Sequence, residues 1–282
     1  MGILYLVGTP IGNLGDFSPR CIEVLNSVDY ICCEDTRVSI NLLRHFNINK
    51  KLVAYHKFNE REKSKSLIND LLNDKNIAII TDAGCPAISD PGYIIVSECI
   101  KNNILVLAIP GPSAVITSLM SSGFDTSRFT FYGFLDRDNK HMESTLEDIK
   151  NDSSTLAVIY ESPKRIIKSL KKIDEALDNP NICVCNDLTK KFEKKYYGNT
   201  KDVIEELNSN KNHELGEYVI VIEYKKQDKI ENSLSIEALL IDEVVKNNCT
   251  LKEAIKIVSD KYKISKNEVY NTSLNLKKIF NR

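Results

Sequence analysis

The sequence predicts an α/β protein whose first region forms a parallel, doubly wound sheet, followed by a second α/β region and a small helical region. Short apolar segments alternate with helical patterns through the first two regions, which is typical of strands and helices that build a layered sheet. After Tyr224 the chain becomes polar and then helical. We therefore expect three domains, at 1–122, 123–226 and 234–282.

The composition is that of a globular protein with a sizeable core. The chain has 282 residues, of which 42% are hydrophobic and 27% charged, so disorder is excluded. Lys and Arg total 38 against 39 Asp and Glu, a net charge of −1 that gives no hint of nucleic acid. No apolar run is long enough to span a bilayer, and 3–7 lacks the basic lead-in of a signal peptide. We expect a cytoplasmic protein that does not contact membranes.

The eight cysteines form no C-x-x-C pair. Cys32 and Cys33 are adjacent on an expected strand, and Cys183 and Cys185 alternate on another. Reduced thiols at such positions serve as small core hydrophobes, so we favour structural thiols over metal ligands and expect no metal site.

Apolar spacing and helix-start signals define the elements of the first region. Strands are expected at 3–7, 29–33, 51–54, 77–80 and 104–109, with helices between them. Ser18 is expected to cap a helix whose first residue is Pro19, where the fixed φ of proline fits. A further helix is expected at 62–73.

Three turns rich in glycine and proline follow strands of this sheet, at 8–14, 82–92 and 110–114. The carboxyl ends of parallel strands meet at one edge of a sheet, so the turns should converge on a crevice for an extended small molecule. Glycine lets a ligand approach the backbone closely. Neither G-x-G-x-x-G nor G-K-[ST] is present, so the crevice does not resemble a usual phosphate site. For 82–92 taken alone, an ordinary tight connection is the alternative.

Polar segments end two other strands. Residues 34–37 place three ionisable side chains where the second strand ends. They either line the crevice or begin a helix, with Asp35 or Thr36 as its cap. Residues 55–61 mix aromatic, cationic and amide side chains, which suits a flat or anionic ligand.

The second region is expected to contain strands at 129–133, 155–160, 182–187 and 218–224, and helices near 141–150 and 163–176. Between residues 164 and 201 the sequence contains ten Lys and Arg but only five Asp and Glu. The lysines of this segment form either a solvated face or a footprint for a phosphate backbone.

The third region is expected to follow a linker at 227–233 and to form helices at 234–248, 251–261 and 266–280. Thr250 and Glu253 form a capping box. The apolar pattern resembles a small helix-turn-helix, which could bind nucleic acid or pack on a partner.

Five ordered motifs resemble one known family, the ribosomal RNA small subunit methyltransferase I family. They are residues 6–14, 34–37, 82–92, 110–114 and 161–165. The resemblance implies the two-domain tetrapyrrole-methylase, or class III methyltransferase, fold. It also implies S-adenosylmethionine-dependent methylation of a cytidine ribose 2′-hydroxyl in the decoding centre of 16S ribosomal RNA, within the small ribosomal subunit, by a homodimer.

The resemblance further implies which residues meet S-adenosylmethionine. They are Gly8, Pro10, Ala83, Gly84, Cys85, Ile88, Ser113, Ala114, Tyr160 and Leu188. The family usually has Thr at the position of Cys85, His at those of Phe58 and Lys164, and Ala at that of Cys32 or Cys33, so this sequence departs from the pattern there.

A ribose hydroxyl is a poor nucleophile until a positioned group takes its proton. The candidates for that role are Glu34, Asp35, Asn59 and Glu161. The residues expected to hold RNA phosphates are Arg37, Lys164 and Arg165. We expect Asp82 and Asp90 to shape their turn or meet the cofactor rather than act in catalysis.

Two other functions remain open at this point. One is methylation of a small tetrapyrrole-like metabolite, against which stand the motifs at 34–37 and 161–165, the lysine clusters and the helical tail. The other is a non-catalytic, ligand-sensing protein that binds nucleic acid through its tail.

Overall fold

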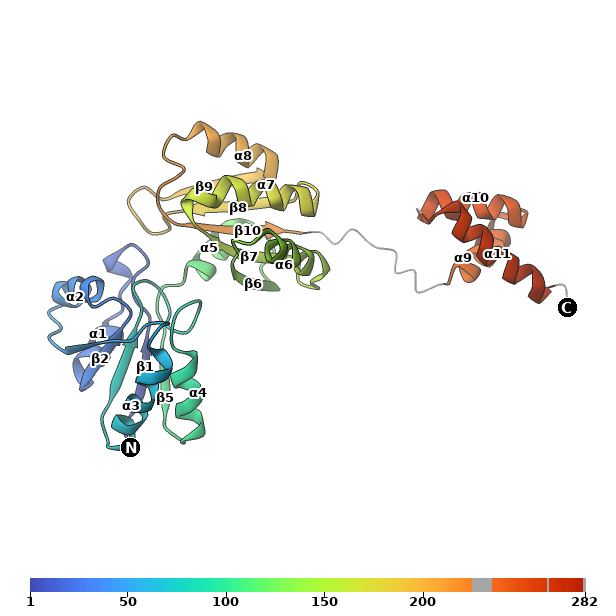
Figure 1. Ribbon diagram of the computed structural model, residues 1–282. Helices are drawn as coiled ribbons and strands as arrows, with labels where there is room; N and C mark the ends of the chain where they lie inside the picture. The colour runs from blue at the N-terminus through green and yellow to red at the C-terminus, as the bar shows by residue number, and fades with distance from the viewer. Residues whose placement is uncertain (225–234, 263, 281–282) are drawn as a thin grey trace. The chain divides into compact units, whose positions relative to one another are not determined.

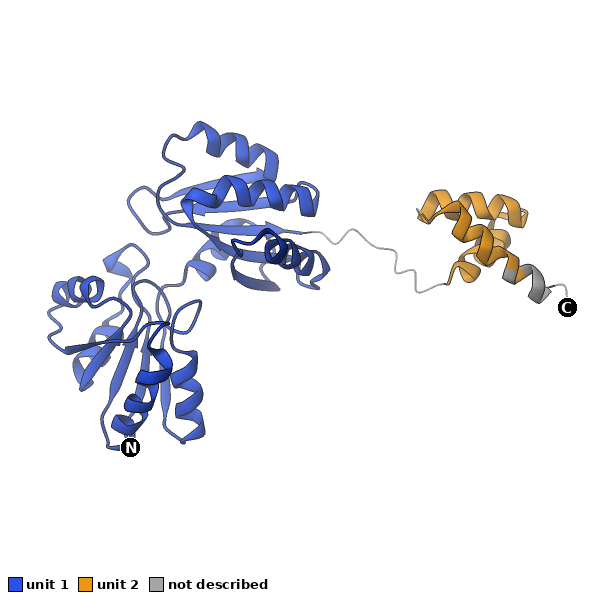
Figure 2. Ribbon diagram, in the orientation of Figure 1, with its two compact units in different colours: residues 1–225 blue, residues 226–282 orange. Residues whose placement is uncertain are grey.

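The computed structural model describes residues 1–224, 235–262 and 264–280. The chain divides into two compact units, residues 1–225 and 226–282, shown in different colours in Figure 2. Each unit is described here by itself. The linker expected at 227–233 lies outside the described residues.

The first half of the larger unit is a five-stranded sheet in which every paired strand is parallel, in the order β3-β2-β4-β1-β5. Its strands are β1 (Leu4–Val7), β2 (Tyr30–Cys33), β3 (Lys51–Ala54), β4 (Ile77–Ile80) and β5 (Val106–Ile109). The doubly wound sheet predicted from the alternating pattern is therefore confirmed. The strand expected to begin at residue 104 begins at Val106.

Helices cover both faces of this sheet (Figure 1). They are α1 (Pro19–Ser27), α2 (Thr36–His45), α3 (Glu60–Leu72), α4 (Tyr93–Lys101) and the short 3-10 helix η1 (Leu14–Asp16). Side chains of α1 and α2 share one core with the sheet, and side chains of α3 and α4 share another. Ser18 caps α1 as predicted, since its Oγ accepts from the backbone N–H of Cys21 at 3.2 Å.

The second half of the larger unit is a mixed sheet in the order β6-β7-β10-β8-β9. Only the β6–β7 pair is parallel. Its strands are β6 (Phe129–Phe134), β7 (Leu156–Glu161), β8 (Asn181–Asn186), β9 (Lys194–Asn199) and β10 (Tyr218–Glu223). Its helices are α6 (Asn139–Asn151), η2 (Pro163–Arg165), α7 (Ile166–Leu177) and α8 (Thr200–Ser209).

Strand β9 and helix α8 were not expected from the sequence. In β9 only Tyr196 is buried, because the strand lies at the edge of the sheet and its lysines face solvent. Two of the four lysines of the cluster at 190–195, Lys194 and Lys195, belong to this edge strand, where charges discourage pairing with another chain.

Helix α5 (Ala114–Ser122) follows β5 but packs on the second sheet. Its buried residues Val115 and Leu119 share a core with Val158 of β7 and Val219 of β10. The two sheets are thus joined by a common apolar core as well as by the chain. Helix α5 ends at Gly123, whose φ of 79° suits glycine. The domain boundary expected at 122/123 stays a prediction.

The smaller unit contains α9 (Ile236–Asn247), α10 (Leu251–Tyr262) and α11 (Lys266–Phe280). Leu240, Ala254, Val258 and Val269 are fully buried in its core. The predicted capping box is present: the Thr250 N–H donates to Glu253 Oε2 at 2.8 Å, and Glu253 N–H donates back to Thr250 Oγ1 at 3.4 Å.

The cysteines of the described residues are all free, and six of the eight are buried. This is the structural role expected for them. Among the helices of the described residues, none is long and apolar enough to cross a membrane.

Candidate functional site

The three glycine and proline turns of the first sheet converge, as predicted. Thr9 and Gly84 form a backbone bridge, with N–H to O distances of 2.8 and 3.2 Å between the first and second turns. The thiol of Cys85 lies 3.5 Å from the carbonyl oxygen of Pro112 and so links the second turn to the third. The first and third turns touch through Gly8 and Gly111.

The contact between Gly8 and Gly111 explains why both are glycine. A Cβ on Gly111 would lie 2.7 Å from the Cα of Gly8, closer than side-chain carbons approach backbone. The glycine that the sequence suggested for ligand approach at position 8 is therefore required by the neighbouring turn. In the second turn Gly84 has a φ of 86°, a conformation that disfavours other residues.

A cavity of about 390 Å³ opens where these turns face the second sheet. From the first sheet it is lined by Ile11, Glu34, Asp82, Ala83, Gly84, Cys85, Ile88, Ser89, Asp90, Ser113 and Ala114. From the second it is lined by Phe134, Tyr160, Glu161, Ser162, Pro163, Leu188, Glu217, Tyr218 and Val219. Volume and mixed lining are those of a site for a small organic molecule.

Eight of the ten residues expected to meet a cofactor line this cavity. They are Ala83, Gly84, Cys85, Ile88, Ser113, Ala114, Tyr160 and Leu188. Gly8 and Pro10 are not part of its lining; Pro10 borders a separate, shallower hollow with Asn41 and His45. Gly8 instead contacts the third turn through Gly111.

Five carboxyl groups line the cavity, and three of them have partners. Asp82 Oδ1 accepts the backbone N–H of Asp35 at 3.2 Å. Glu217 Oε2 lies 2.9 Å from the Nζ of Lys190. Glu161 is bound within its own turn. For Glu34 and Asp90 the described residues provide neither a hydrogen bond nor an ion pair.

Burial and mutual repulsion perturb the three carboxyl groups on the first-sheet side. Burial first, and then the nearby charges of Glu34 and Asp82, raise the pKa of Asp90 to about 7. The pKa of Glu34 is also raised, first by burial and then by Asp82. Burial raises the pKa of Asp82 as well, against the hydrogen bond from Asp35. When carboxyl groups share a pocket in this way, the negative charge of one raises the pKa of the others, so they do not all ionise at the same pH.

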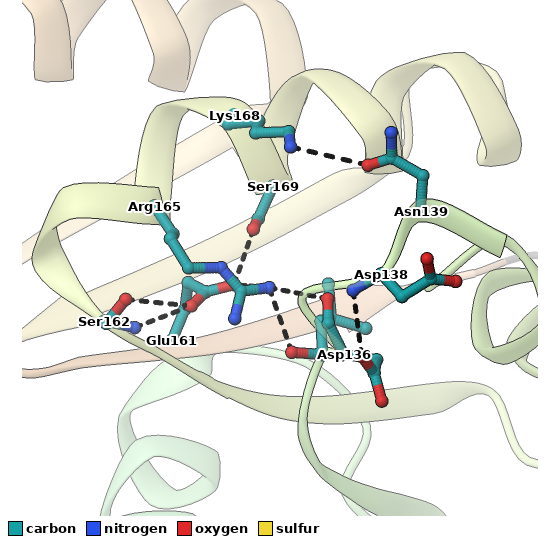
Figure 3. A network of polar contacts seen from close by, with 9 residues as sticks. Asp136, Asp138, Asn139, Glu161, Ser162, Arg165, Lys168 and Ser169 are labelled. Atoms are coloured by element: carbon teal, nitrogen blue, oxygen red, sulfur yellow. Dashed lines mark hydrogen bonds and ion pairs between the residues drawn. The ribbon is translucent and has the colours of Figure 1, made fainter. Parts of the chain in front are cut away.

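Glu161 is the centre of a polar network rather than a free acid (Figure 3). Its Oε1 accepts the backbone N–H of Ser162 at 2.7 Å, and its Oε2 accepts the hydroxyl of Ser169. Arg165 Nη2 lies 3.4 Å from Oε2 and donates to the carbonyl oxygens of Leu135 and Asp136, each at 2.9 Å. The network holds the turn after β7 against the segment after β6.

Two further catalytic candidates lie outside the cavity lining. Asp35 is the N-cap of α2 and forms an ion pair with Arg37, whose Nη2 lies 2.6 Å from Asp35 Oδ2. The Arg37 hydrogen bonds hold the pKa of Asp35 at about 2. Asn59 Oδ1 accepts the backbone N–H of His56 at 2.9 Å, and its amide donates to the Ala54 carbonyl. Both side chains thus support local turns.

Of the cations expected to hold RNA phosphates, Arg37 and Lys164 are exposed and Arg165 is engaged by Glu161. Arg37 has 89% of its side chain exposed even while it pairs with Asp35. Lys190 and Lys195, by contrast, are paired with acidic neighbours. The lysine-rich segment therefore includes several solvated or paired side chains.

Glu60, which the sequence did not single out, holds the second turn in place. It is only 8% exposed, at the start of α3. Its Oε1 accepts from the backbone N–H groups of Gly92 and Ile94, at 2.9 and 3.2 Å, and from the Tyr55 hydroxyl at 3.0 Å. A carboxylate at the start of α4 satisfies amides that a helix leaves unpaired.

Sequence reasoning also missed the cavity residues that come from β6 and β10. Phe134 ends β6, and its ring lies 5.4 Å from that of Tyr160. Tyr218 begins β10 and pairs with Glu161 across an antiparallel ladder. Because β10 runs antiparallel to β7 and β8, its beginning lies at the edge where β6, β7 and β8 end, and a search for the carboxyl ends of strands does not find it. The Phe134 position was detectable as a strand end.

A parallel sheet with glycine turns, facing a mixed sheet across a cavity, is the architecture of tetrapyrrole methylases. The family profile described as Tetrapyrrole (Corrin/Porphyrin) Methylases matches residues 3–204. The crystal structure of uroporphyrin-III C-methyltransferase from Thermus thermophilus complexed with S-adenyl homocysteine has a TM-score of 0.52 and 14% identity, covering 78% of this chain and 97% of that one.

Similarity to curated proteins identifies the family within the tetrapyrrole methylases to which the chain belongs. A protein from Buchnera aphidicola subsp. Schizaphis graminum is 36% identical over 275 residues, covering 97% of this chain and 96% of its own length. One from Halalkalibacterium halodurans is 39% identical over 274 residues, covering 96% and 94%. Both carry the name ribosomal RNA small subunit methyltransferase I. The chain belongs to that family of methyltransferases.

Proposed function

We propose that the protein transfers a methyl group from S-adenosylmethionine to the ribose 2′-hydroxyl of a cytidine in the decoding centre of 16S ribosomal RNA. The observation that carries the proposal is the near full-length similarity to the methyltransferase I relatives, which extends over 96 to 97% of this chain. Ribosomal RNA is cytoplasmic in bacteria, so we propose that compartment as the place of action.

The cavity fits the methyl donor. Gly84 and Ala83 offer backbone without bulk, and Ile88, Leu188 and Tyr160 supply apolar contact. Ser113 and Ala114 at the start of α5 complete the wall. S-adenosylmethionine supplies an electrophilic methyl group on a sulfonium cation, and carboxyl groups along one side of the cavity favour a cation. The neighbour complexed with S-adenyl homocysteine supports the same choice of donor.

The RNA would approach over the open rim of the cavity. Arg37 follows β2 and Lys164 follows β7, so their exposed side chains flank the cavity from both sheets. Cations at such positions orient a phosphate backbone without reading sequence. Arg165 contributes by holding the turn that carries Lys164. Among the four carboxylate and amide candidates for catalysis, Glu34 alone both lines the cavity and has no partner within the described residues.

We also propose a homodimer. Ile116 and Met120, one turn apart on α5, have 47% and 82% of their surface exposed. An exposed apolar stripe of this kind suits a second copy of the chain. Light scattering on the purified protein tests this: a mass near twice 31.9 kDa supports it, and a monomer at micromolar concentration contradicts it.

The experiment that tests the activity is transfer from tritiated S-adenosylmethionine. The protein is incubated with small ribosomal subunits, and in parallel with protein-free 16S RNA, from a strain that lacks the gene. Label on ribosomal RNA supports the proposal. Label only on a metabolite supports a small-molecule methylase, and binding without transfer supports a ligand-sensing nucleic-acid binder.

A further inference from the structure

We propose that Asp90 is the group that accepts the proton of the ribose hydroxyl. The proposal rests on the proposed function and adds to it the catalytic residue that the sequence did not identify. The sequence predicts that Asp90 shapes its turn or meets the cofactor, and the structure places it in that turn, in the lining of the cavity.

Asp90 satisfies the first requirement of a general base, which is a carboxylate that faces the reaction space without a partner. Of the five carboxyl groups that line the cavity, Asp82, Glu161 and Glu217 are held by donors of the protein. Glu34 and Asp90 have no such donor among the described residues. A carboxylate already bound by an arginine or a backbone amide is a weaker proton acceptor.

The loop that carries Asp90 is held firmly. Ala87 and Ser89 have φ angles of 67° and 64°, an uncommon conformation for residues other than glycine. The loop closes through the Ala87 N–H, which donates to the Pro91 carbonyl at 3.2 Å. Glu60 fixes its far end through Gly92. Backbone strain that the surroundings maintain in this way is typical of functional sites.

The position of Asp90 also distinguishes it from Glu34. The charges of Glu34 and Asp82, which follow β2 and β4, raise the pKa of Asp90, and the charge of Asp90 in turn raises the pKa values of Cys85 in the same turn and Tyr160 of β7. Asp90 and Tyr160 line the same cavity, and Ser89, the neighbour of Asp90, has its Oγ 3.8 Å from the place that a Cβ on Gly133 of β6 would take. A group near both walls is near a substrate held between them.

The electrostatics suit the role. Burial and the two neighbouring carboxylates raise the pKa of Asp90 to about 7. A general base whose pKa lies near the working pH is largely in its ionised form and is still basic enough to accept the proton. By contrast, the pKa of Asp35 is about 2, which makes that group a poor proton acceptor.

The step balances without a further reactant. The hydroxyl O–H bond breaks as its proton passes to the Asp90 carboxylate. The oxygen forms a bond to the methyl carbon, and the carbon–sulfur bond breaks with its electron pair left on sulfur. A sulfonium, an alcohol and a carboxylate thereby become a thioether, a methyl ether and a carboxylic acid.

Single-turnover transfer to small subunits, measured from about pH 5 to pH 8, tests the proposal. In the wild type the rate should rise with pH to a plateau, with a midpoint between about 5 and 7, since the bound sulfonium lowers the pKa of Asp90 from its value of about 7. Asp90→Asn should lower the plateau rate by roughly 10² to 10⁴-fold and Asp90→Glu should recover part of it. The affinity of Asp90→Asn for S-adenosylmethionine, measured by calorimetry, should change by less than about tenfold.

Glu34→Gln is the matched comparison. Removing that charge lowers the pKa of Asp90, so the midpoint should move to lower pH, and any loss of plateau rate should be clearly smaller than that of Asp90→Asn. Asp90→Asn with the wild-type rate, or a loss confined to Glu34→Gln, overturns the proposal and leaves the methylation activity intact. A flat wild-type profile also overturns it, and this result does not depend on any variant folding. A wild type that transfers no label overturns the proposed function and this inference together.

Discussion

Replacing Glu60 with alanine should destabilise the protein and weaken its binding of S-adenosylmethionine. The change removes the acceptor of two backbone N–H groups, those of Gly92 and Ile94, at the beginning of α4. Hydrogen bonds to a charged group contribute about 1.5 kcal/mol each at the low end, so the loss is about 3 kcal/mol. For a chain of this size that lowers the melting temperature by about 6 to 12 °C.

The ligand effect follows from the loop. Residues 85–90 form one wall of the cavity. Without the Glu60 hydrogen bonds this loop is less ordered in the free protein, so ligand binding must order it. About 1 kcal/mol of ordering free energy corresponds to roughly fivefold weaker binding. Thermal unfolding followed by circular dichroism and calorimetric titration with S-adenosylmethionine measure the two effects.

The matched control is Glu60→Gln. Its amide keeps one carbonyl oxygen that can accept the same N–H groups, so its loss of stability should be clearly smaller than that of Glu60→Ala. A Glu60→Ala protein that melts within about 2 °C of the wild type and binds S-adenosylmethionine equally well would refute the reasoning.

Two further predictions concern the turns and the rim. Gly111→Ala should lower the melting temperature more than Gly123→Ala. A Cβ at Gly111 would lie 2.7 Å from backbone, whereas at Gly123 nothing lies within 4 Å of a Cβ and the cost is only that of alanine at a φ of 79°; equal losses, measured by thermal unfolding, would contradict the close contact of the turns. Arg37→Ala and Lys164→Ala should each weaken RNA binding. Each should also reduce the slope of the logarithm of the binding constant against the logarithm of the salt concentration by about one. Lys101→Ala, whose cation lies at the far end of α4, is the control and should leave both quantities unchanged; an equal effect of all three, measured by filter binding across salt concentrations, would count against a specific RNA rim.

The first sheet could be predicted almost completely from the sequence. Each of its strands is a short apolar run followed by a turn signal, and helix starts such as Ser18 before Pro19 have a local physical cause. The second sheet was predicted less well. Its edge strand β9 buries only Tyr196, so it lacks the apolar pattern by which the other strands were found.

The cavity was predicted where it is built from turns and missed where it depends on tertiary contacts. Gly84 and Ser113 follow directly from motifs in the sequence. Glu60 lies in a stretch that is predominantly polar, and only the folded chain brings it to the start of α4. Similarly, Glu161 and Asp90 look alike as acidic residues near turns, and only their partners distinguish a bound carboxylate from an unpartnered one.

The central claim is methylation of a ribose hydroxyl of 16S ribosomal RNA, and nucleoside analysis of the product tests it most directly. RNA from subunits treated with the protein and S-adenosylmethionine is digested to nucleosides and examined by mass spectrometry. We expect 2′-O-methylcytidine to appear in proportion to the label transferred. Label found on a nucleobase, or no methylated cytidine in RNA that carries the label, would contradict the account.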